Sequence, residues 1–260
     1  MTPTALTIAG SDPSGGAGLQ ADLKTFHQHG VYGMAVVSLV TVQNTQAVTR
    51  VEVLAPKLVA QQLDAVLADI PPGAVKTGAL GSAGVIEVVA ARAAKLTCPL
   101  VVDPVMVSKH GHALLAPDAA QALVTQLLPV TTLLTPNTEE AAALLGAPVK
   151  TVADARDAAR RIAALGPQAV LVKGGHLEGD AVDVLFHDGL VTEHHAPRVA
   201  SQHTHGTGCT YSAAITAWLA RGLELTEAVT RAKVWLTEAI RTPPGVGGGI
   251  GPVNHLAPLR

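Results

Sequence analysis

The sequence of 260 residues has few cysteines, few aromatic side chains and no long apolar run. Its two cysteines, Cys98 and Cys209, are too few for a disulfide framework, which indicates a reducing compartment. Apolar segments are broken by Gly, Pro or Asp before they reach the length of a membrane span. The N-terminus lacks the basic and apolar regions of a signal peptide, and no cluster of Lys and Arg indicates nucleic-acid binding. We therefore expect a cytoplasmic protein that binds neither membranes nor nucleic acids.

Most of the apolar residues are small or aliphatic. Hydrophobic residues make up 48% of the chain, and it contains only two Phe, two Tyr and two Trp. This composition favours close packing of helices on a sheet. The net charge is −2, and charges of both signs are interspersed along the chain. The length suits one large α/β domain, and no linker or internal repeat is visible. We expect a single domain over residues 1–260.

Short apolar runs alternate with helical patterns along the chain. Because parallel strands are buried on both faces, they appear as continuous apolar runs. The predicted strands are Ala5–Ala9, Ala35–Thr41, Leu100–Asp103, Leu133–Thr135 and Ala169–Lys173. The predicted helices include Leu19 to Phe26 with a stop at Gly30, Leu63 to Ile70, Val152 to Leu165, and Tyr211–Ala220. This alternation predicts an α/β fold with a mostly parallel central sheet and helices on both faces.

A second type of pattern follows the last of these strands. Val182–Phe186 and Leu190–His194 are joined by the turn residues Asp188-Gly189. This combination is typical of an antiparallel hairpin, which we place at an edge of the sheet.

A glycine-rich loop, residues 9–18, follows the first predicted strand. Ligands of such sheets bind at the carboxyl ends of the strands, and glycine lets the backbone approach a ligand closely. The spacing differs from the dinucleotide motif G-x-G-x-x-G, because four residues that include Pro13 separate Gly10 from the next glycine, Gly15. A tight turn without a ligand is the alternative.

A second loop, residues 204–210, precedes the predicted helix that starts near Tyr211. Free backbone N–H groups at a helix N-terminus bind anions, and the helix dipole reinforces them. The same position should stabilise a thiolate, so we expect the pKa of the Cys209 thiol to be lowered. An inert core cysteine is the alternative.

Asp103, Glu140 and Lys173 each follow a predicted strand. Isolated carboxylates are commonly surface groups or helix caps, and Asn137 with Glu140 forms a good capping box. Two acids and a lysine at the ends of neighbouring strands are also how Mg²⁺ and nucleotide phosphates are held. Lys173 precedes Gly174, Gly175 and His176, and we expect it to be dispensable for folding. The chain contains no Walker A motif.

These segments together resemble the bacterial hydroxymethylpyrimidine/phosphomethylpyrimidine kinases, which belong to the ribokinase-like superfamily. The resemblance covers Thr7 to His255. It is carried by IAGSDPSGGAGLQADLKTF, VQNT, VVDPVM, TPNTEEAAALLG, VLVKGGH, THGTGCTYSAAI and GIGPVNH. It implies a ribokinase-like αβα sandwich. It also implies that ATP, with Mg²⁺, phosphorylates 4-amino-5-hydroxymethyl-2-methylpyrimidine to its monophosphate and then to its diphosphate, as a step of thiamine biosynthesis.

The resemblance also implies roles for single residues. The aminopyrimidine would contact Gly10, Asp22, Gln43 and Met106. ATP and its phosphates would contact Asn137, Glu140, Lys173, Gly206, Thr207 and Gly208. Mg²⁺ would bind Asp103 and Glu140, and Cys209 and Lys173 would be catalytic. Two departures from the family pattern affect the pocket: Ala79 removes side-chain bulk, and Gly248 stands where a histidine often interrupts the glycines. We expect a homodimer.

Other functions remain open at this stage. A pyridoxal kinase of the same fold also phosphorylates a hydroxymethyl group on a nitrogen heteroaromatic ring. A metal-dependent hydrolase would use histidines between His194 and His205 with Cys209, although their spacing matches no familiar zinc motif. A hydrolase with Cys209 as nucleophile would leave Asp103 and Lys173 without a role. A non-catalytic pyrimidine binder is the last possibility.

Overall fold

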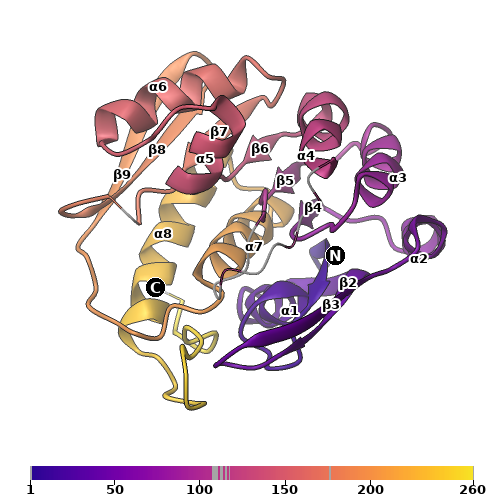
Figure 1. The fold of residues 1–260 in the computed structure, drawn as a ribbon, viewed down its shortest axis with the longest axis horizontal. Helices are drawn as coiled ribbons and strands as arrows, with labels where there is room; N and C mark the ends of the chain where they lie inside the picture. Colours follow the sequence, from indigo (N-terminus) through magenta and orange to yellow (C-terminus); the bar gives the residue numbers. More distant parts are fainter. Residues whose placement is uncertain are drawn as a thin grey trace.

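A single mixed sheet forms the centre of the molecule (Figure 1). The computed structural model describes residues 2–106, 111, 114, 116, 118–175 and 177–259. Within these residues the sheet has nine strands in the order β3-β2-β1-β4-β5-β6-β7-β8-β9. The strands are β1 (Thr4–Ser11), β2 (Tyr32–Gln43), β3 (Val48–Val53), β4 (Ala74–Thr77), β5 (Leu100–Val102), β6 (Leu133–Leu134), β7 (Ala169–Val172), β8 (Ala181–His187) and β9 (Leu190–Ala196).

The middle of the sheet is parallel and its two edges are antiparallel. Strands β2, β1, β4, β5, β6 and β7 pair in parallel, and all of them except β4 were predicted from their apolar runs. β3 pairs antiparallel with β2 at one edge. At the other edge β8 pairs antiparallel with β7, and β9 with β8, so the predicted hairpin is confirmed. The carboxyl ends of the parallel strands therefore lie along one side of the sheet.

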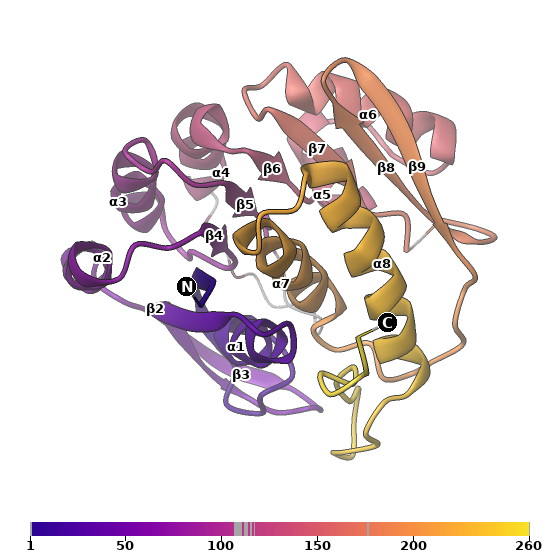
Figure 2. The same cartoon turned by 180° about the vertical axis from the view of Figure 1, so that it is seen from behind.

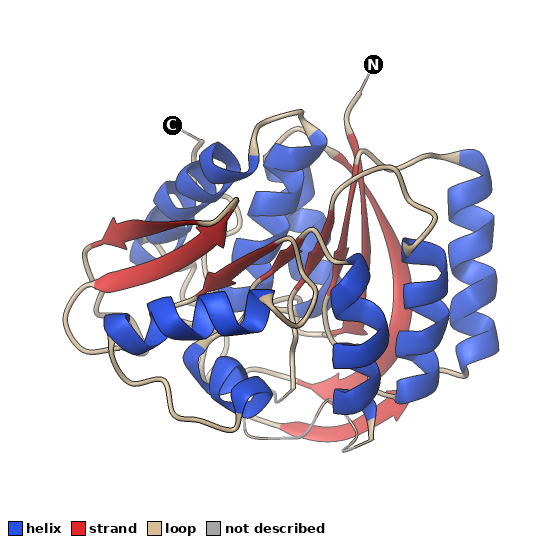
Figure 3. Cartoon of the chain, turned by 90° about the horizontal axis from the view of Figure 1, so that it is seen from above, coloured by secondary structure: helices blue, strands red, loops and turns tan. Residues whose placement is uncertain are grey.

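Helices cover both faces of the sheet (Figures 1 and 2). They are α1 (Gly18–Gln28), α2 (Pro56–Asp69), α3 (Ala83–Ala93), α4 (Ala119–Ala122) with its continuation η1 (Leu123–Leu127) and η2 (Leu128–Val130), α5 (Thr138–Leu145), α6 (Val152–Ala163), α7 (Thr207–Ala220) and α8 (Leu225–Arg241). In Figure 3 the strands lie between two layers of helices. This is the αβα sandwich that the sequence predicted.

Alternate strand residues pack on opposite helix layers, because successive side chains of a strand point to opposite faces. Val101 of β5 and Leu171 of β7 pack with α7 and α8. Their neighbours Val102 and Val172 join the larger core beneath α2 to α6. α1 packs through Phe26 against α7 on the first face. Strands buried on both sides leave their polar residues at the strand ends, where the candidate site lies.

Candidate active site

A cavity of about 1030 Å³ lies at the carboxyl ends of the parallel strands. Every parallel strand contributes to its lining, either with its last residue or with a residue just beyond it. These residues are Ser11 at the end of β1, Gln43 at the end of β2, Gly78 after β4, Asp103 after β5, Asn137 after β6 and Lys173 after β7. The start of α7, residues 204–209, closes another side. This is the expected ligand position in an α/β sheet.

Asp12 organises the glycine-rich loop that follows β1. Its Oδ1 accepts hydrogen bonds from the N–H and the hydroxyl of Ser14, at 2.9 and 2.7 Å. Its Oδ2 accepts from the N–H groups of Gly16 and Ala17, at 3.2 and 2.9 Å. Burial alone would raise the pKa of this carboxyl group, but hydrogen bonds from His205 and Ser14 lower it below its ordinary value. Asp12 is therefore an ionised acceptor that holds the loop closed.

His205 connects this loop to the loop before α7. Its Nε2 lies 2.7 Å from Asp12 Oδ2, and both side chains are buried. The side-chain amide of Gln43 lies 3.2 Å from the same Nε2. The backbone of His205 is also fixed, because its backbone N–H donates to the carbonyl of Gly251 at 3.0 Å. The ends of β1 and β2 and the start of α7 thus meet at one imidazole.

The backbone turns sharply into α7 at Gly206. This residue has φ 75°, and a Cβ there would lie only 1.8 Å from the carbonyl oxygen of Gly16, so no other residue fits. The N–H groups of the first turn of a helix have no intrahelical acceptor and face outward at its positive end. Because residues 206–209 line the cavity, these N–H groups can meet an anion there.

Asp103 and Lys173 form an ion pair at the centre of the strand ends. Lys173 Nζ lies 2.7 Å from Asp103 Oδ1, and the side chains are 13% and 2% exposed. Thr135 and Ser212 donate their hydroxyls to the same carboxylate, at 3.2 and 3.3 Å. Burial alone would lower the pKa of Lys173, but the carboxylates of Asp103 and Glu140 raise it. The cavity therefore holds a fixed ammonium ion.

This ion pair corrects one expectation from the sequence. The sequence predicts that Lys173, at the end of a strand, is dispensable for folding. In the structure its removal would leave Asp103, which is almost fully buried, without its counter-ion. Lys173 therefore belongs to the stability of the fold as well as to the site.

Glu140 lies in the first turn of α5 and forms the capping box that the sequence predicted. Its carboxylate accepts from the N–H of Asn137 at 2.7 Å, and the Asn137 side chain accepts from the N–H of Glu140 at 2.8 Å. Burial raises the pKa of Glu140 to about 7, Lys173 acts against this rise, and the charge of Asp103 adds to it. Asp103 and Glu140 therefore repel each other beside a single lysine, and a bound cation would reduce this repulsion.

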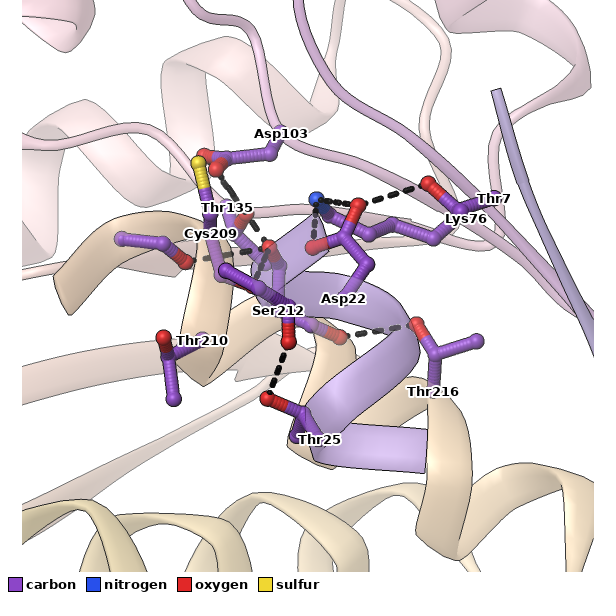
Figure 4. A network of polar contacts seen from close by, with 12 residues as sticks. Thr7, Asp22, Thr25, Lys76, Asp103, Thr135, Cys209, Thr210, Ser212 and Thr216 are labelled. Atoms are coloured by element: carbon purple, nitrogen blue, oxygen red, sulfur yellow. Dashed lines mark hydrogen bonds and ion pairs between the residues drawn. The ribbon is translucent and has the colours of Figure 1, made fainter. Parts of the chain in front are cut away.

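A second ion pair joins Lys76 of β4 to Asp22 of α1 (Figure 4). Lys76 Nζ lies 2.7 Å from both carboxylate oxygens of Asp22, and both side chains are fully buried. Thr7 donates its hydroxyl to Asp22 at 2.6 Å. Burial alone would lower the pKa of Lys76, but Asp22, Cys209 and Asp103 together raise it. Lys76 lines the cavity, whereas Asp22 stands behind it.

Cys209 lines the cavity in the first turn of α7. The sequence predicted a lowered thiol pKa, and the structure contradicts this. Burial raises the pKa of Cys209 to about 11, because a thiolate there loses its hydration. Lys76 opposes the rise, but the carboxylates of Asp22 and Asp103 add to it, so the helix terminus does not decide the balance. Cys98 is also a free thiol.

Comparison with known proteins agrees with this geometry. The family model described as phosphomethylpyrimidine kinase matches residues 12–254. The chain belongs to the phosphomethylpyrimidine kinase family. A hydroxymethylpyrimidine/phosphomethylpyrimidine kinase of Synechococcus elongatus is 50% identical over 99% of this chain and 98% of its own length. The fold class and the resemblance that the sequence indicated are therefore confirmed.

Solved structures of two kinds match this family member. A Bacillus subtilis pyridoxal kinase, determined as an ADP complex, has a TM-score of 0.89 and 40% identity, with coverage of 98% of this chain and 97% of the other. A phosphomethylpyrimidine kinase from Clostridium difficile has a TM-score of 0.81 and 45% identity, with coverage of 91% and 99%. The chain thus shares its ribokinase-like fold with a pyridoxal kinase and with a phosphomethylpyrimidine kinase, the two kinds of kinase that the sequence left open.

The cavity of this phosphomethylpyrimidine kinase homologue brings together most of the residues that the sequence predicted. Those that line it are Gly10, Gln43, Met106, Asn137, Glu140, Lys173, Asp103, Gly206, Thr207, Gly208 and Cys209. Asp22 does not line it, because its carboxylate is held by Lys76 and Thr7. A direct contact from Asp22 to a substrate stays a prediction. His176 lies outside the described residues.

The structure adds three residues to which the sequence analysis gave no role in the site. Asp12 and His205 join two loops, and Lys76 supplies a buried cation. Lys76 follows the apolar pair Ala74-Val75, and a lysine inside so short an apolar run was the available signal. Among the described residues no group of three or more His, Cys, Asp or Glu side chains is placed to hold a metal ion, which gives the zinc-hydrolase alternative no support. The described residues also include no helix long and apolar enough to cross a membrane.

Proposed function

We propose that the chain transfers the γ-phosphoryl group of ATP to 4-amino-5-hydroxymethyl-2-methylpyrimidine, and then a second phosphoryl group to the monophosphate. The observation that carries this proposal is one cavity lined by two chemically different sets of residues. Lys173, Asp103 and the start of α7 suit phosphate groups. Gln43, Gly10 and Met106 suit a ring. The family membership and the names of the relatives support the same conclusion.

The first set of residues suits phosphoryl transfer, which depends on positioning and charge neutralisation more than on covalent chemistry. Lys173 is a fixed ammonium ion, and the N–H groups of Gly206, Thr207, Gly208 and Cys209 stand at the positive end of α7. We propose that Asn137, Glu140 and these groups contact ATP. The transferred phosphoryl group would lie between Lys173 and the first turn of α7.

The residues present fit a magnesium ion. Mg²⁺ is held by one or two carboxylates together with phosphates and water. Asp103 and Glu140 line the cavity on neighbouring strand ends, and burial together with the charge of Asp103 raises the pKa of Glu140, so a bound cation would favour its ionised form. We propose that these two residues hold Mg²⁺, which when bound would neutralise charge on the nucleotide phosphates.

Cys209 and Lys76 both line the cavity. We propose that Cys209, in its thiolate form, takes the proton of the hydroxymethyl group in the first transfer. Lys76, fixed by Asp22, is a cation that favours the charge of the Cys209 thiolate. The second transfer has an ionised phosphate as its acceptor and needs no base. Because Asp22 fixes Lys76 and does not itself line the cavity, we propose that it acts on the substrate through Lys76.

A panel of acceptors tests the assignment. With ATP and Mg²⁺, the value of kcat/KM for the hydroxymethylpyrimidine should exceed that for pyridoxal by at least tenfold. A preference for pyridoxal would make the chain a pyridoxal kinase, which the structural match to the Bacillus subtilis enzyme favours as the second candidate. Turnover of neither acceptor, with binding retained, would point to a pyrimidine-binding protein.

We also propose that the kinase acts as a homodimer in the cytoplasm, where ATP is available. Val40 and Val42 of β2 point to the same face near the sheet edge and are 42% and 57% exposed. A second copy that covers this strip would remove apolar surface from water. Sedimentation of a dimer, and of a monomer for Val42→Glu, is the expected result. A monomeric parent chain would refute it.

A further inference from the structure

The side-chain amide of Gln43 faces a nitrogen atom that is itself a donor. As placed, Gln43 Nε2 lies 3.2 Å from His205 Nε2. His205 Nε2 also lies 2.7 Å from Asp12 Oδ2, which is a short distance for a hydrogen bond. One imidazole nitrogen is thus shared between a carboxylate and an amide. Which of them it donates to decides the orientation of Gln43.

Asp12 requires the proton to be on Nε2. Its two oxygens already accept four hydrogen bonds from Ser14, Gly16 and Ala17. A carboxylate in that position is ionised and can only accept, which agrees with its lowered pKa. If Nε2 carried no proton, two lone pairs would face each other at 2.7 Å in a buried place. His205 Nε2 is therefore N–H, whichever state Nδ1 takes.

A donor at Nε2 excludes an amide NH₂ group as its neighbour. The oxygen and nitrogen of a glutamine amide have nearly the same shape and are assigned from their hydrogen bonds. The oxygen of Gln43 must therefore be the atom next to His205, where it shares the N–H with Asp12. A half-turn of the amide satisfies this and turns the NH₂ group away from the imidazole, on a side chain that lines the cavity.

We propose that Asp12 and His205 hold Gln43 with its oxygen on the imidazole and its NH₂ group in the cavity, where it recognises an acceptor nitrogen of a heteroaromatic ring. Gln43 is then a donor to the ring, and the exocyclic amino group of an aminopyrimidine must find its partner elsewhere. His205 and Asp12 are positioning residues, since they act through Gln43. This inference rests on the proposed function and adds which atom of the substrate is read.

Replacing Gln43 by glutamate or by alanine separates the two orientations. Glutamate has the same length but offers only acceptors at neutral pH. If the NH₂ group reads a ring nitrogen, Gln43→Ala should weaken binding roughly 5–100-fold, and Gln43→Glu should weaken it at least tenfold more. If the oxygen reads the amino group, Gln43→Glu should bind as well as the parent chain. Calorimetry at pH 7.5, with ATP affinity as the control for folding, measures this.

Ligand analogues identify the atom that is read. Replacing the contacted ring nitrogen by CH should weaken binding to the parent chain but not to Gln43→Ala, because the lost contact is the same one. An analogue without the amino group should lose equally with both chains. The contribution of His205 is tested by His205→Leu, which should abolish discrimination against the CH analogue, and by His205→Gln, whose amide N–H should restore part of it.

The outcomes are distinguishable from failure of the function itself. If the parent chain does not bind the hydroxymethylpyrimidine, the proposed function and this inference both fail. If the parent chain binds it and Gln43→Glu binds it equally well, or if Gln43 is coupled to the amino group and not to a ring nitrogen, only the inference is overturned.

Discussion

At the scale of single residues, the site depends on buried charges that are paired. Asp103 with Lys173, and Asp22 with Lys76, place two ammonium ions at the cavity in fixed positions. Removing one partner of a buried ion pair is costly because it leaves the other charge without hydration or a counter-ion. These lysines therefore link catalysis to stability, and variants at them must be tested for both.

Lys173→Met is expected to lower the free energy of unfolding by about 1–3 kcal/mol, less than for a fully enclosed pair because the cavity gives water access to Asp103. Turnover at saturating ATP should fall by roughly 10²–10³-fold, the scale for one lost donor to a developing anion. The double variant Asp103→Asn/Lys173→Met should regain most of the stability and none of the turnover. Denaturant unfolding and initial rates measure the two effects.

Lys150→Met is the matched control, because Lys150 is an exposed lysine and lines no part of the cavity. It should change neither stability nor turnover. A Lys173→Met chain that unfolds like the parent and turns over normally would show that the phosphate site has been placed on the wrong residue.

Cys209→Ala should slow transfer to the hydroxymethyl group by roughly 10²–10⁴-fold and transfer to the monophosphate far less, because only the hydroxyl needs a base. A thiol with a pKa of about 11 is mostly protonated near neutrality. The first transfer should therefore accelerate as the pH rises from 6 to 9 in the parent chain, and less so in the variant. Cys98→Ala is the control. Equal losses in both transfers would remove Cys209 from the role of base.

The residue types at the strand ends were predictable, but their electrostatics were not. Asp103, Glu140 and Lys173 follow apolar runs, and that position alone indicated a common site. The pKa of Cys209 depends on Lys76 and two carboxylates from other strands and helices. The partner of Asp22 lies 54 positions further along the chain. No local pattern carries such information.

At the scale of elements, the helix layer formed by α1, α7 and α8 contains a buried histidine. His29 follows α1, stacks edge-on against Trp218 of α7 and Trp235 of α8, and binds the carbonyl of Thr25 through Nδ1 at 2.8 Å. Burial lowers the pKa of His29 to about 4. In the unfolded chain the same ring has its ordinary pKa near 6.5.

This difference makes the layer sensitive to acid. Above pH 6.5 both states of His29 are neutral and its contribution to stability is complete. As the pH falls from 6.5 towards 4, His29 is protonated in the unfolded chain but stays neutral in the folded chain, so the free energy of unfolding decreases. His29→Leu should be less stable at pH 7 but should lose roughly 2 kcal/mol less than the parent over this range. Thermal or urea unfolding at several pH values measures the slope.

His27 provides the control, since it is an exposed histidine in the last turn of the same helix. His27→Gln should leave the slope unchanged. Parallel pH profiles of the parent chain and His29→Leu would contradict the account of this layer.

The elements that the sequence analysis missed are those with mixed patterns. β3 alternates Val with charged or polar residues because it is an edge strand, exposed along much of its length. β4 is interrupted by Lys76, which only its pairing with Asp22 allows inside the protein. α8 is different, because its apolar stripe through Leu225, Val229 and Leu236 is regular and predicts a helix. The predicted strands and the edge hairpin are present because their apolar patterns match their burial.

At the scale of the whole molecule, the sheet brings distant parts of the chain to one place. Gln43, Asp103, Lys173 and Cys209 are far apart in sequence, and all line the same cavity. Gln43 comes from β2, whereas Asp103 and Lys173 follow β5 and β7, so the residues proposed for the ring and for the phosphates come from different strands of one sheet. Both transfers are therefore expected at this one site. The assignment of residues 1–260 to a single domain stays a prediction.

The time course of phosphorus-31 resonances tests this expectation directly. The purified chain is incubated with ATP, Mg²⁺ and 4-amino-5-hydroxymethyl-2-methylpyrimidine, and the products are followed as they form. We expect a phosphomonoester signal that rises first and then declines as diphosphate signals replace it, with about two ADP formed for each pyrimidine consumed. Lys173→Met should suppress both stages together. ATP that stays intact in the presence of the pyrimidine, or loss of only one stage in the variant, would contradict the account.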